Sequence, residues 1–162
     1  MTQLLKLFSV SIFTSAVLLS FATTVETTPI KCMIQMTNYK GEGAYVIISL
    51  ITPKGEYEET LYVQGKDREW YSEIPEWWKF YGKRNSGIDA ISGATISGGG
   101  RTVSVVKIPN SKINTGYSIR FETAVEDQEY YTDDVQFELT SESVQSKVDG
   151  RGFIRYVRMI PQ

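Results

Sequence analysis

Hydrophobic and polar residues alternate along much of the chain, and the alternation is clearest between residues 117 and 125. Tyr, Ile, Phe, Thr and Val occupy every second position there, and mainly polar or charged residues lie between them. Successive side chains of a β-strand point to opposite faces, so a period of two is typical of a strand. This segment is therefore predicted to be a strand with one buried face and one face in water.

Other segments carry the same pattern or a continuous β-branched one. Residues 44–51 are almost all apolar, which is typical of a central strand buried on both faces. Pro53-Lys54-Gly55 is predicted to form a turn, and Asp149-Gly150 a hairpin turn. The remaining predicted strands are residues 32–36, 58–63, 135–139 and 153–160.

The middle of the chain breaks the alternation. Residues 75–81 are dense in aromatics and begin with Pro75, which predicts a short helix that ends at Gly82. Residues 82–100 are polar and Gly-rich, and we interpret them as one long loop of the kind that carries function. The predicted fold is mainly β: a single antiparallel immunoglobulin-like β-sandwich of about seven or eight strands, with one short helix and a long Gly-rich loop.

The first 22 residues have the three parts of a signal peptide. Lys6 gives a basic start, residues 7–19 are apolar, and Ser20-Phe21-Ala22 is a small-x-small cleavage site. The apolar run is too short for a membrane span, which needs roughly 20 residues, although a short anchor or a buried helix is the alternative. We expect cleavage after Ala22, no stable membrane insertion afterwards, and a single domain of residues 23–162 in the periplasm or secreted.

Composition excludes several classes of function. The formal net charge is −2, and loss of residues 1–22 would leave 16 basic and 19 acidic residues without a basic patch, so nucleic acid is not an expected partner. The chain has no His and one Cys, which excludes Ser-His-Asp and Cys-His catalysis and the common zinc sites. No catalytic residue and no metal site is predicted. The acidic residues between 126 and 134 are interpreted as a solvated hairpin tip rather than a Ca²⁺ loop.

The predicted loop contains a short motif formed by Asp89, Ser92, Gly93, Ala94 and Thr95. This pattern, Asp-x-x-Ser-Gly-Ala-Thr, resembles the acceptor motif of the bacterial flavin transferase ApbE. Enzymes of that exported, Mg²⁺-dependent family transfer FMN from FAD to the Thr hydroxyl as a phosphoester. The resemblance implies that Thr95 carries covalent FMN and that the other four residues are recognised by the transferase.

The motif also has a physical rationale. Small neighbours such as Gly93 and Ala94 leave a modifying enzyme room to reach the hydroxyl of Thr95. Backbone N–H groups between Ser97 and Gly100 are expected to be free to bind a phosphate, as in a turn that forms an anion-binding nest. The alternative is that this segment is merely a flexible loop.

A second resemblance covers most of the chain after the predicted signal peptide. Trp70, Ile74-Pro75-Glu76-Trp77-Trp78 and the segment from Asp89 to Thr95 occur in the order found in an exported family called domain of unknown function 2271. The resemblance implies an immunoglobulin-like sandwich that accompanies PepSY-type membrane redox proteins and ApbE. Trp77 and Trp78 are candidates to pack on the flavin ring, although filling of the core is the favoured role for this aromatic cluster.

Together these features predict an exported electron-transfer protein with FMN attached to a loop threonine by an ApbE-type transferase. It would not be an enzyme, because its redox chemistry would be that of the cofactor. The alternative is an unmodified immunoglobulin-like periplasmic binding or accessory module that uses the same loop for protein contacts.

Overall fold

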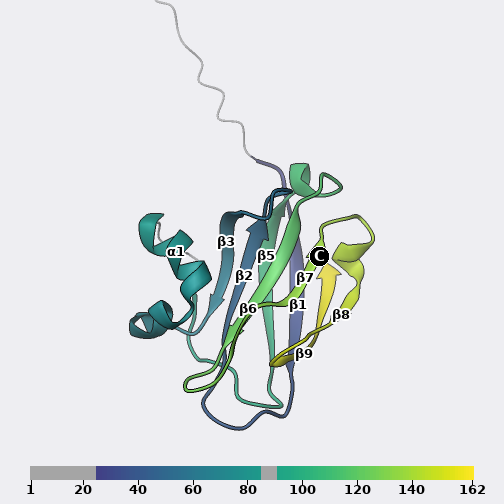
Figure 1. Ribbon diagram of the computed structural model, residues 1–162. Coiled ribbons are helices and arrows are strands. Elements are labelled where there is room, and N and C mark those ends of the chain that lie inside the picture. The colour runs from purple at the N-terminus through teal and green to yellow at the C-terminus, as the bar shows by residue number, and fades with distance from the viewer. Residues whose placement is uncertain (1–24, 85–90) are drawn as a thin grey trace, which may run out of the picture.

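The computed structural model describes residues 25–84 and 91–162, so the predicted signal peptide lies outside the described residues. The described chain is mainly β, as predicted, and its strands form two sheets (Figure 1). The first sheet has the order β5-β1-β9-β8, and all its pairings are antiparallel. Its strands are β1 (Thr27–Met36), β5 (Arg101–Pro109), β8 (Lys147–Asp149) and β9 (Ile154–Pro161).

The second sheet has the order β4-β3-β2-β6-β7. It is antiparallel except for the two-residue strand β4, which pairs in parallel with the end of β3. Its strands are β2 (Tyr45–Ile51), β3 (Tyr57–Gln64), β4 (Ile91–Ser92), β6 (Ser118–Ala124) and β7 (Tyr130–Glu138). The helical segments are η1 (Arg68–Glu73), α1 (Pro75–Arg84), η2 (Asn110–Lys112) and η3 (Ser143–Gln145).

The main core lies between the two sheets. Cys32 and Ile34 on β1 and Phe121 on β6 are fully buried and belong to one cluster of hydrophobic side chains. Burial raises the pKa of the Cys32 thiol to about 12, so this cysteine is an inert core residue. The alternation in the sequence places these side chains inside and their neighbours outside, as predicted for strands.

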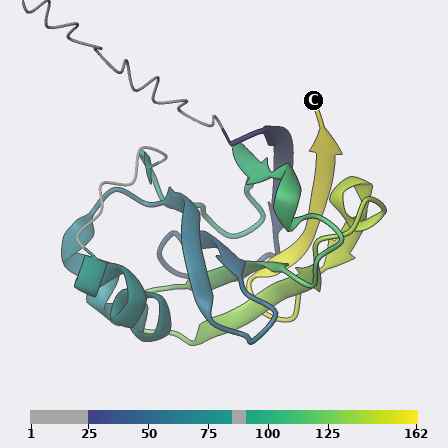
Figure 2. The same cartoon turned by 90° about the horizontal axis from the view of Figure 1, so that it is seen from above.

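A second core covers the outer face of the second sheet. Segments η1 and α1 lie beside β3, on the opposite side of the molecule from β9 (Figures 1 and 2). Tyr71 and Trp77 from these segments are fully buried against the sheet. The indole N–H of Trp77 donates a 2.8 Å hydrogen bond to Thr60, and its ring stacks on Tyr81 with the centroids 4.8 Å apart. The Trp and Tyr polar atoms thus find partners while their rings fill the core.

This second core corrects the prediction of a half-wet strand at residues 117–125. Glu122 and Ala124 were expected to face water, but Glu122 is 0% exposed and Ala124 is also buried. Both lie on the outer face of β6, which η1 and α1 were not expected to cover. The prediction for residues 44–51 is confirmed, because every residue of β2 is buried.

The predicted end of the helix is also wrong. Helix α1 continues through Gly82 to Arg84. A side chain at Gly82 would contact the ring of Trp78 at 3.1 Å, so glycine here lets Trp78 lie along the helix. The expected long loop is shorter for the same reason, and it also contains β4.

The acidic segment from residue 126 to 134 does not lie entirely at a hairpin tip. Asp133 and Asp134 belong to β7, and Asp134 is buried. The Asp134 carboxylate accepts hydrogen bonds from the hydroxyl of Thr123 and from the backbone N–H groups of Gly152 and Ile154, at 2.6 to 2.9 Å. It therefore fixes the turn between β8 and β9, which is a structural role.

The two neighbouring tryptophans provide a test of the second core. Trp77→Ala is expected to lower the free energy of unfolding by about 3–5 kcal/mol, because it leaves a cavity and an unpaired Thr60 hydroxyl. Trp78→Ala is the control and should cost less than about 2 kcal/mol, because Trp78 is 36% exposed. Urea denaturation followed by circular dichroism measures both. Equal losses would show that α1 does not pack on the sheet as described.

Candidate functional site

The backbone of the predicted motif is attached to the end of β3. Strand β4, with Ser92, pairs with Gln64, and the Gln64 side-chain amide donates to the carbonyl of Ala94. The N–H of Lys66 donates to the carbonyl of Gly93 at 3.3 Å. These contacts give the segment a defined path along the sheet, in contrast to a freely flexible loop.

Ile96, the residue that follows the motif, is also fixed by hydrogen bonds. Ala44 and Ile96 form an isolated antiparallel bridge, with N–H···O distances of 2.8 and 3.0 Å. The hydroxyl of Tyr39 joins this bridge, because it donates to the Ile96 carbonyl and accepts from the Ala44 N–H at 2.8 Å. Thr95 is therefore held between two anchored neighbours.

Thr95 lies against the backbone of Gly43. A Cβ atom at Gly43 would be 2.1 Å from the Thr95 hydroxyl oxygen, so only glycine permits this contact. On the other side of Thr95 the motif is open: Gly93 and Ala94 are exposed, and no described atom lies within 4 Å of the place where a Gly93 Cβ would be. Thr95 is half-buried and can be approached from the side of Gly93.

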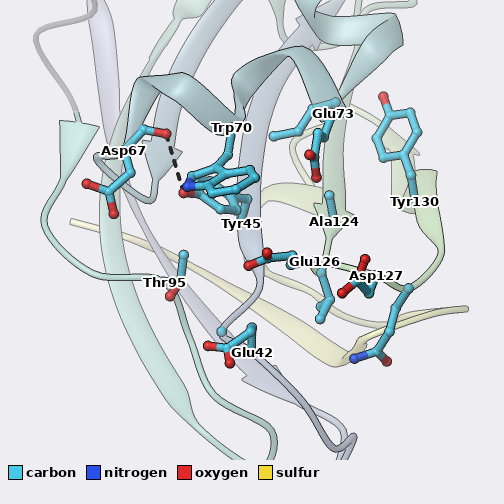
Figure 3. A pocket seen from close by; sticks show the side chains of 14 residues that line it. Glu42, Tyr45, Asp67, Trp70, Glu73, Thr95, Ala124, Glu126, Asp127 and Tyr130 are labelled. Carbon is cyan, nitrogen blue, oxygen red and sulfur yellow. Dashed lines mark hydrogen bonds between the residues drawn. The ribbon is translucent and has the colours of Figure 1, made fainter.

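Thr95 also lines a cavity of about 200 Å³ beside η1. Tyr45 and Trp70 line it too, and Trp70 is 37% exposed (Figure 3). Among the described residues that line the cavity there is no Lys or Arg. Five carboxylates from three separate segments line it instead: Glu42, Asp67, Glu73, Glu126 and Asp127.

The negative charge affects a neighbouring phenol. The hydroxyl of Tyr45 donates to the backbone carbonyl of Asp67 at 3.4 Å (Figure 3). Burial, followed by the charge of Asp67 and other carboxylates, raises the pKa of Tyr45 to about 12. Tyr45 therefore stays neutral and can only donate or accept hydrogen bonds at ordinary pH. The cavity as a whole disfavours additional negative charge.

A buried carboxyl group lies next to the cavity. Tyr130, which lines the cavity, donates a hydrogen bond to Glu122, and Tyr57 donates to the other oxygen of that carboxyl at 2.8 Å. Burial raises the pKa of Glu122 to about 7, and the two phenols and Arg120 oppose the shift. Glu76 on α1 adds to the increase. Burial, together with the negative charge of Glu122, raises the pKa of both phenols as well.

The predicted site residues are distributed as follows. Thr95 lines the cavity, whereas Gly93 and Ala94 are exposed and do not line it, and Ser92 precedes them in β4. Asp89 lies outside the described residues.

The aromatic candidates occupy other places. Trp77 is buried in the second core and Trp78 lies on the outside of α1; neither lines the cavity. A role for these two rings at a flavin stays a prediction. Trp70 from the same aromatic cluster lines the cavity.

Two of the four backbone N–H groups that were expected to be free for a phosphate after the motif are not free. The N–H of Gly99 donates to the carbonyl of Thr37 at 2.7 Å, and the N–H of Gly100 donates to Ser97 at 2.9 Å. Both groups are therefore used within the chain. These glycines instead connect the motif to β5.

Fold and site define a small, mainly β protein in which a threonine packs against Gly43 at an acidic, aromatic cavity. The chain belongs to the family described as predicted periplasmic protein (DUF2271), whose model matches residues 27–156. The comparisons with curated proteins and with solved structures gave no match. Within the described residues, no helix has the length and hydrophobicity needed to cross a membrane.

Glu122 gives a prediction about pH. Its pKa is about 7 in the folded protein against an ordinary value of 4.5, so the unfolded state binds fewer protons between these values. The free energy of unfolding should therefore fall as the pH rises from about 4.5 to 7, by about 3 kcal/mol from this group. Glu122→Gln should remove that fall, whereas the exposed control Glu56→Gln should keep it.

Urea denaturation at a series of pH values measures this difference. Parallel pH profiles of the free energy of unfolding for the wild type and Glu122→Gln would contradict the raised pKa of the buried Glu122 carboxyl.

Proposed function

We propose that this protein is an exported electron carrier with FMN attached to Thr95 through a phosphoester, on a domain of immunoglobulin-like type. The motif from Asp89 to Thr95 supports the modification, and the periplasmic description of the family supports export. The observation that carries the proposal is the position of Thr95. Thr95 lines a cavity and follows two exposed small residues on a backbone that is fixed by hydrogen bonds.

An acceptor threonine needs both order and access. The hydrogen bonds to Gly93, Ala94 and Ile96 fix the backbone on both sides of Thr95. Access is supplied by Gly93, around which the space is open. A modifying enzyme can therefore bind the segment without unfolding the sheet, which favours a motif that is recognised in the folded protein.

The described residues fit an attachment site better than an enclosing pocket. A volume of about 200 Å³ is below the roughly 300–1,000 Å³ typical of ligand pockets, so much of an FMN would remain in water. The carboxylates of the cavity offer a phosphate no positive partner. A covalent bond to Thr95 supplies the retention that such a cavity lacks.

The bound cofactor would supply the electron-accepting and electron-donating chemistry. Trp70 offers a partly exposed indole face for a planar ring, since aromatic rings prefer offset or edge-to-face contact. Tyr45 would remain neutral beside it, and the carboxylates would disfavour a net negative charge on any group in the cavity. The partners implied are an ApbE-type flavin transferase and a PepSY-type membrane redox protein.

An unmodified binding or accessory module is the second candidate. The acidic, aromatic lining of the cavity favours it specifically, because such a lining suits a positively charged peptide or amine. The two candidates differ in one observable, which is the covalent attachment of flavin.

Substitutions at Thr95 test the attachment. Co-production with an ApbE-type transferase and export should give a flavin-fluorescent band in a denaturing gel for the wild type and for Thr95→Ser. Thr95→Ala should abolish the band, because the phosphoester needs a side-chain hydroxyl. Thr115→Ala, which removes the hydroxyl of an exposed threonine outside the motif, is the control and should keep it. Fluorescence retained in Thr95→Ala would refute Thr95 as the acceptor.

Gly93→Ala separates recognition from folding. The added methyl group has no neighbour within 4 Å, so the free energy of unfolding should change by less than about 1 kcal/mol. If the transferase needs the small residue, the yield of covalent flavin should nevertheless fall at least about tenfold. Normal modification of this variant would show that Gly93 is not part of the recognised sequence.

A further inference from the structure

The outer face of the first sheet combines exposed hydrophobic side chains with positive charge. Val103 and Val105 on β5 and Ile160 on β9 are 51, 48 and 37% exposed. They are three of the six large hydrophobic residues that are exposed in the described part of the chain. All three point away from the core, because their neighbours Val106 and Met159 point into it.

The strand register brings these side chains together. Val105 lies opposite Lys31 of β1, which in turn lies opposite Ile160. One row further along, Val103 lies opposite Met33. Hydrophobic and basic side chains are therefore interspersed on a continuous surface that spans the edge strand β5 and its neighbours β1 and β9. We call this surface the basic sheet face.

Basic residues lie among and around these hydrophobic side chains. Within the described strands of the face, the only acidic side chain is Asp149, which lies 3.5 Å from Lys147. Lys147 also lies directly opposite Arg158, and like charges in this position repel each other. A chain with a formal net charge of −2 has therefore gathered positive charge on one face. The basic residues of the face are Lys31, Arg101, Lys107, Lys147 and Arg158.

The chemistry of the face indicates what it contacts. Protein interfaces are depleted in Lys and depend on Trp, Tyr and Arg as central anchors, whereas three of the five basic residues of this face are Lys and its exposed large hydrophobic residues are Val and Ile. Aliphatic side chains surrounded by Lys and Arg are typical of surfaces that bind at the headgroup level of an anionic membrane. We propose that the basic sheet face docks on an anionic phospholipid bilayer.

Docking in this orientation leaves the candidate site accessible. The cavity is formed at η1 and the outer side of the second sheet, and the two sheets pack face to face. The basic sheet face and the cavity therefore point in different directions, and Thr95 would stay open to water. The inference does not depend on the proposed flavin, and each can fail without the other.

Vesicle co-sedimentation tests the inference, with the exported protein purified from the periplasm. The protein should bind vesicles that mix phosphatidylglycerol with phosphatidylcholine, and the partition coefficient should fall as salt is added. Pure phosphatidylcholine vesicles should bind it weakly. Each Lys or Arg near an anionic surface is worth about fivefold in affinity.

Matched variants locate the binding face. Lys107→Glu with Arg158→Glu should lower the partition coefficient at least about tenfold. The control Lys40→Glu with Lys54→Glu makes a similar charge change at exposed positions off the face and should lower it clearly less. Val103→Ser with Val105→Ser should lower it about tenfold and leave the salt dependence in place, because binding also scales with the buried apolar area.

Three results would overturn the inference. The first is absence of binding to anionic vesicles at low salt, as expected if the charges serve only solubility. The second is an equal loss in the face variant and the control variant. The third is self-association in size-exclusion chromatography that the face variant abolishes, without any vesicle binding; the face would then be an interface between copies of this chain.

Discussion

The second sheet is covered on both faces, and the other features of the molecule depend on this. Its inner face packs on the first sheet, and its outer face is covered by η1 and α1. Trp77 is the largest fully buried side chain under this cover, and its indole N–H is paired with Thr60. Without the cover, β2 would expose half of its hydrophobic residues to water.

The cover also determines the electrostatics of the candidate site. The cover formed by η1 and α1 helps to bury Glu122 and its two tyrosine partners. The edge of the cover at η1 forms one wall of the cavity. Trp70 and Thr95 both line the cavity, although they belong to different segments. The acidic cavity and the basic sheet face then point in different directions, so the two proposed contacts, with a transferase and with a bilayer, would not compete for the same surface.

Local patterns predicted most of the strands, but not the contacts that cover them. The alternation at residues 117–125 identified β6, because a period of two depends only on neighbouring residues. The same pattern gave no indication that Glu122 is buried, since that depends on η1 and α1 packing from elsewhere in the chain. The motif around Thr95 was visible because its residues are contiguous. The carboxylates of the cavity were not, because three separate segments supply them.

The most direct test of the central claim is peptide mass spectrometry of the wild-type protein, co-produced with an ApbE-type transferase, exported, denatured and digested with trypsin. Cleavage after Arg84 and Arg101 releases one peptide that contains the whole motif. The account predicts that this peptide carries one FMN and that fragmentation places it on Thr95. An unmodified peptide, or FMN on Ser92 or Ser97, would contradict it.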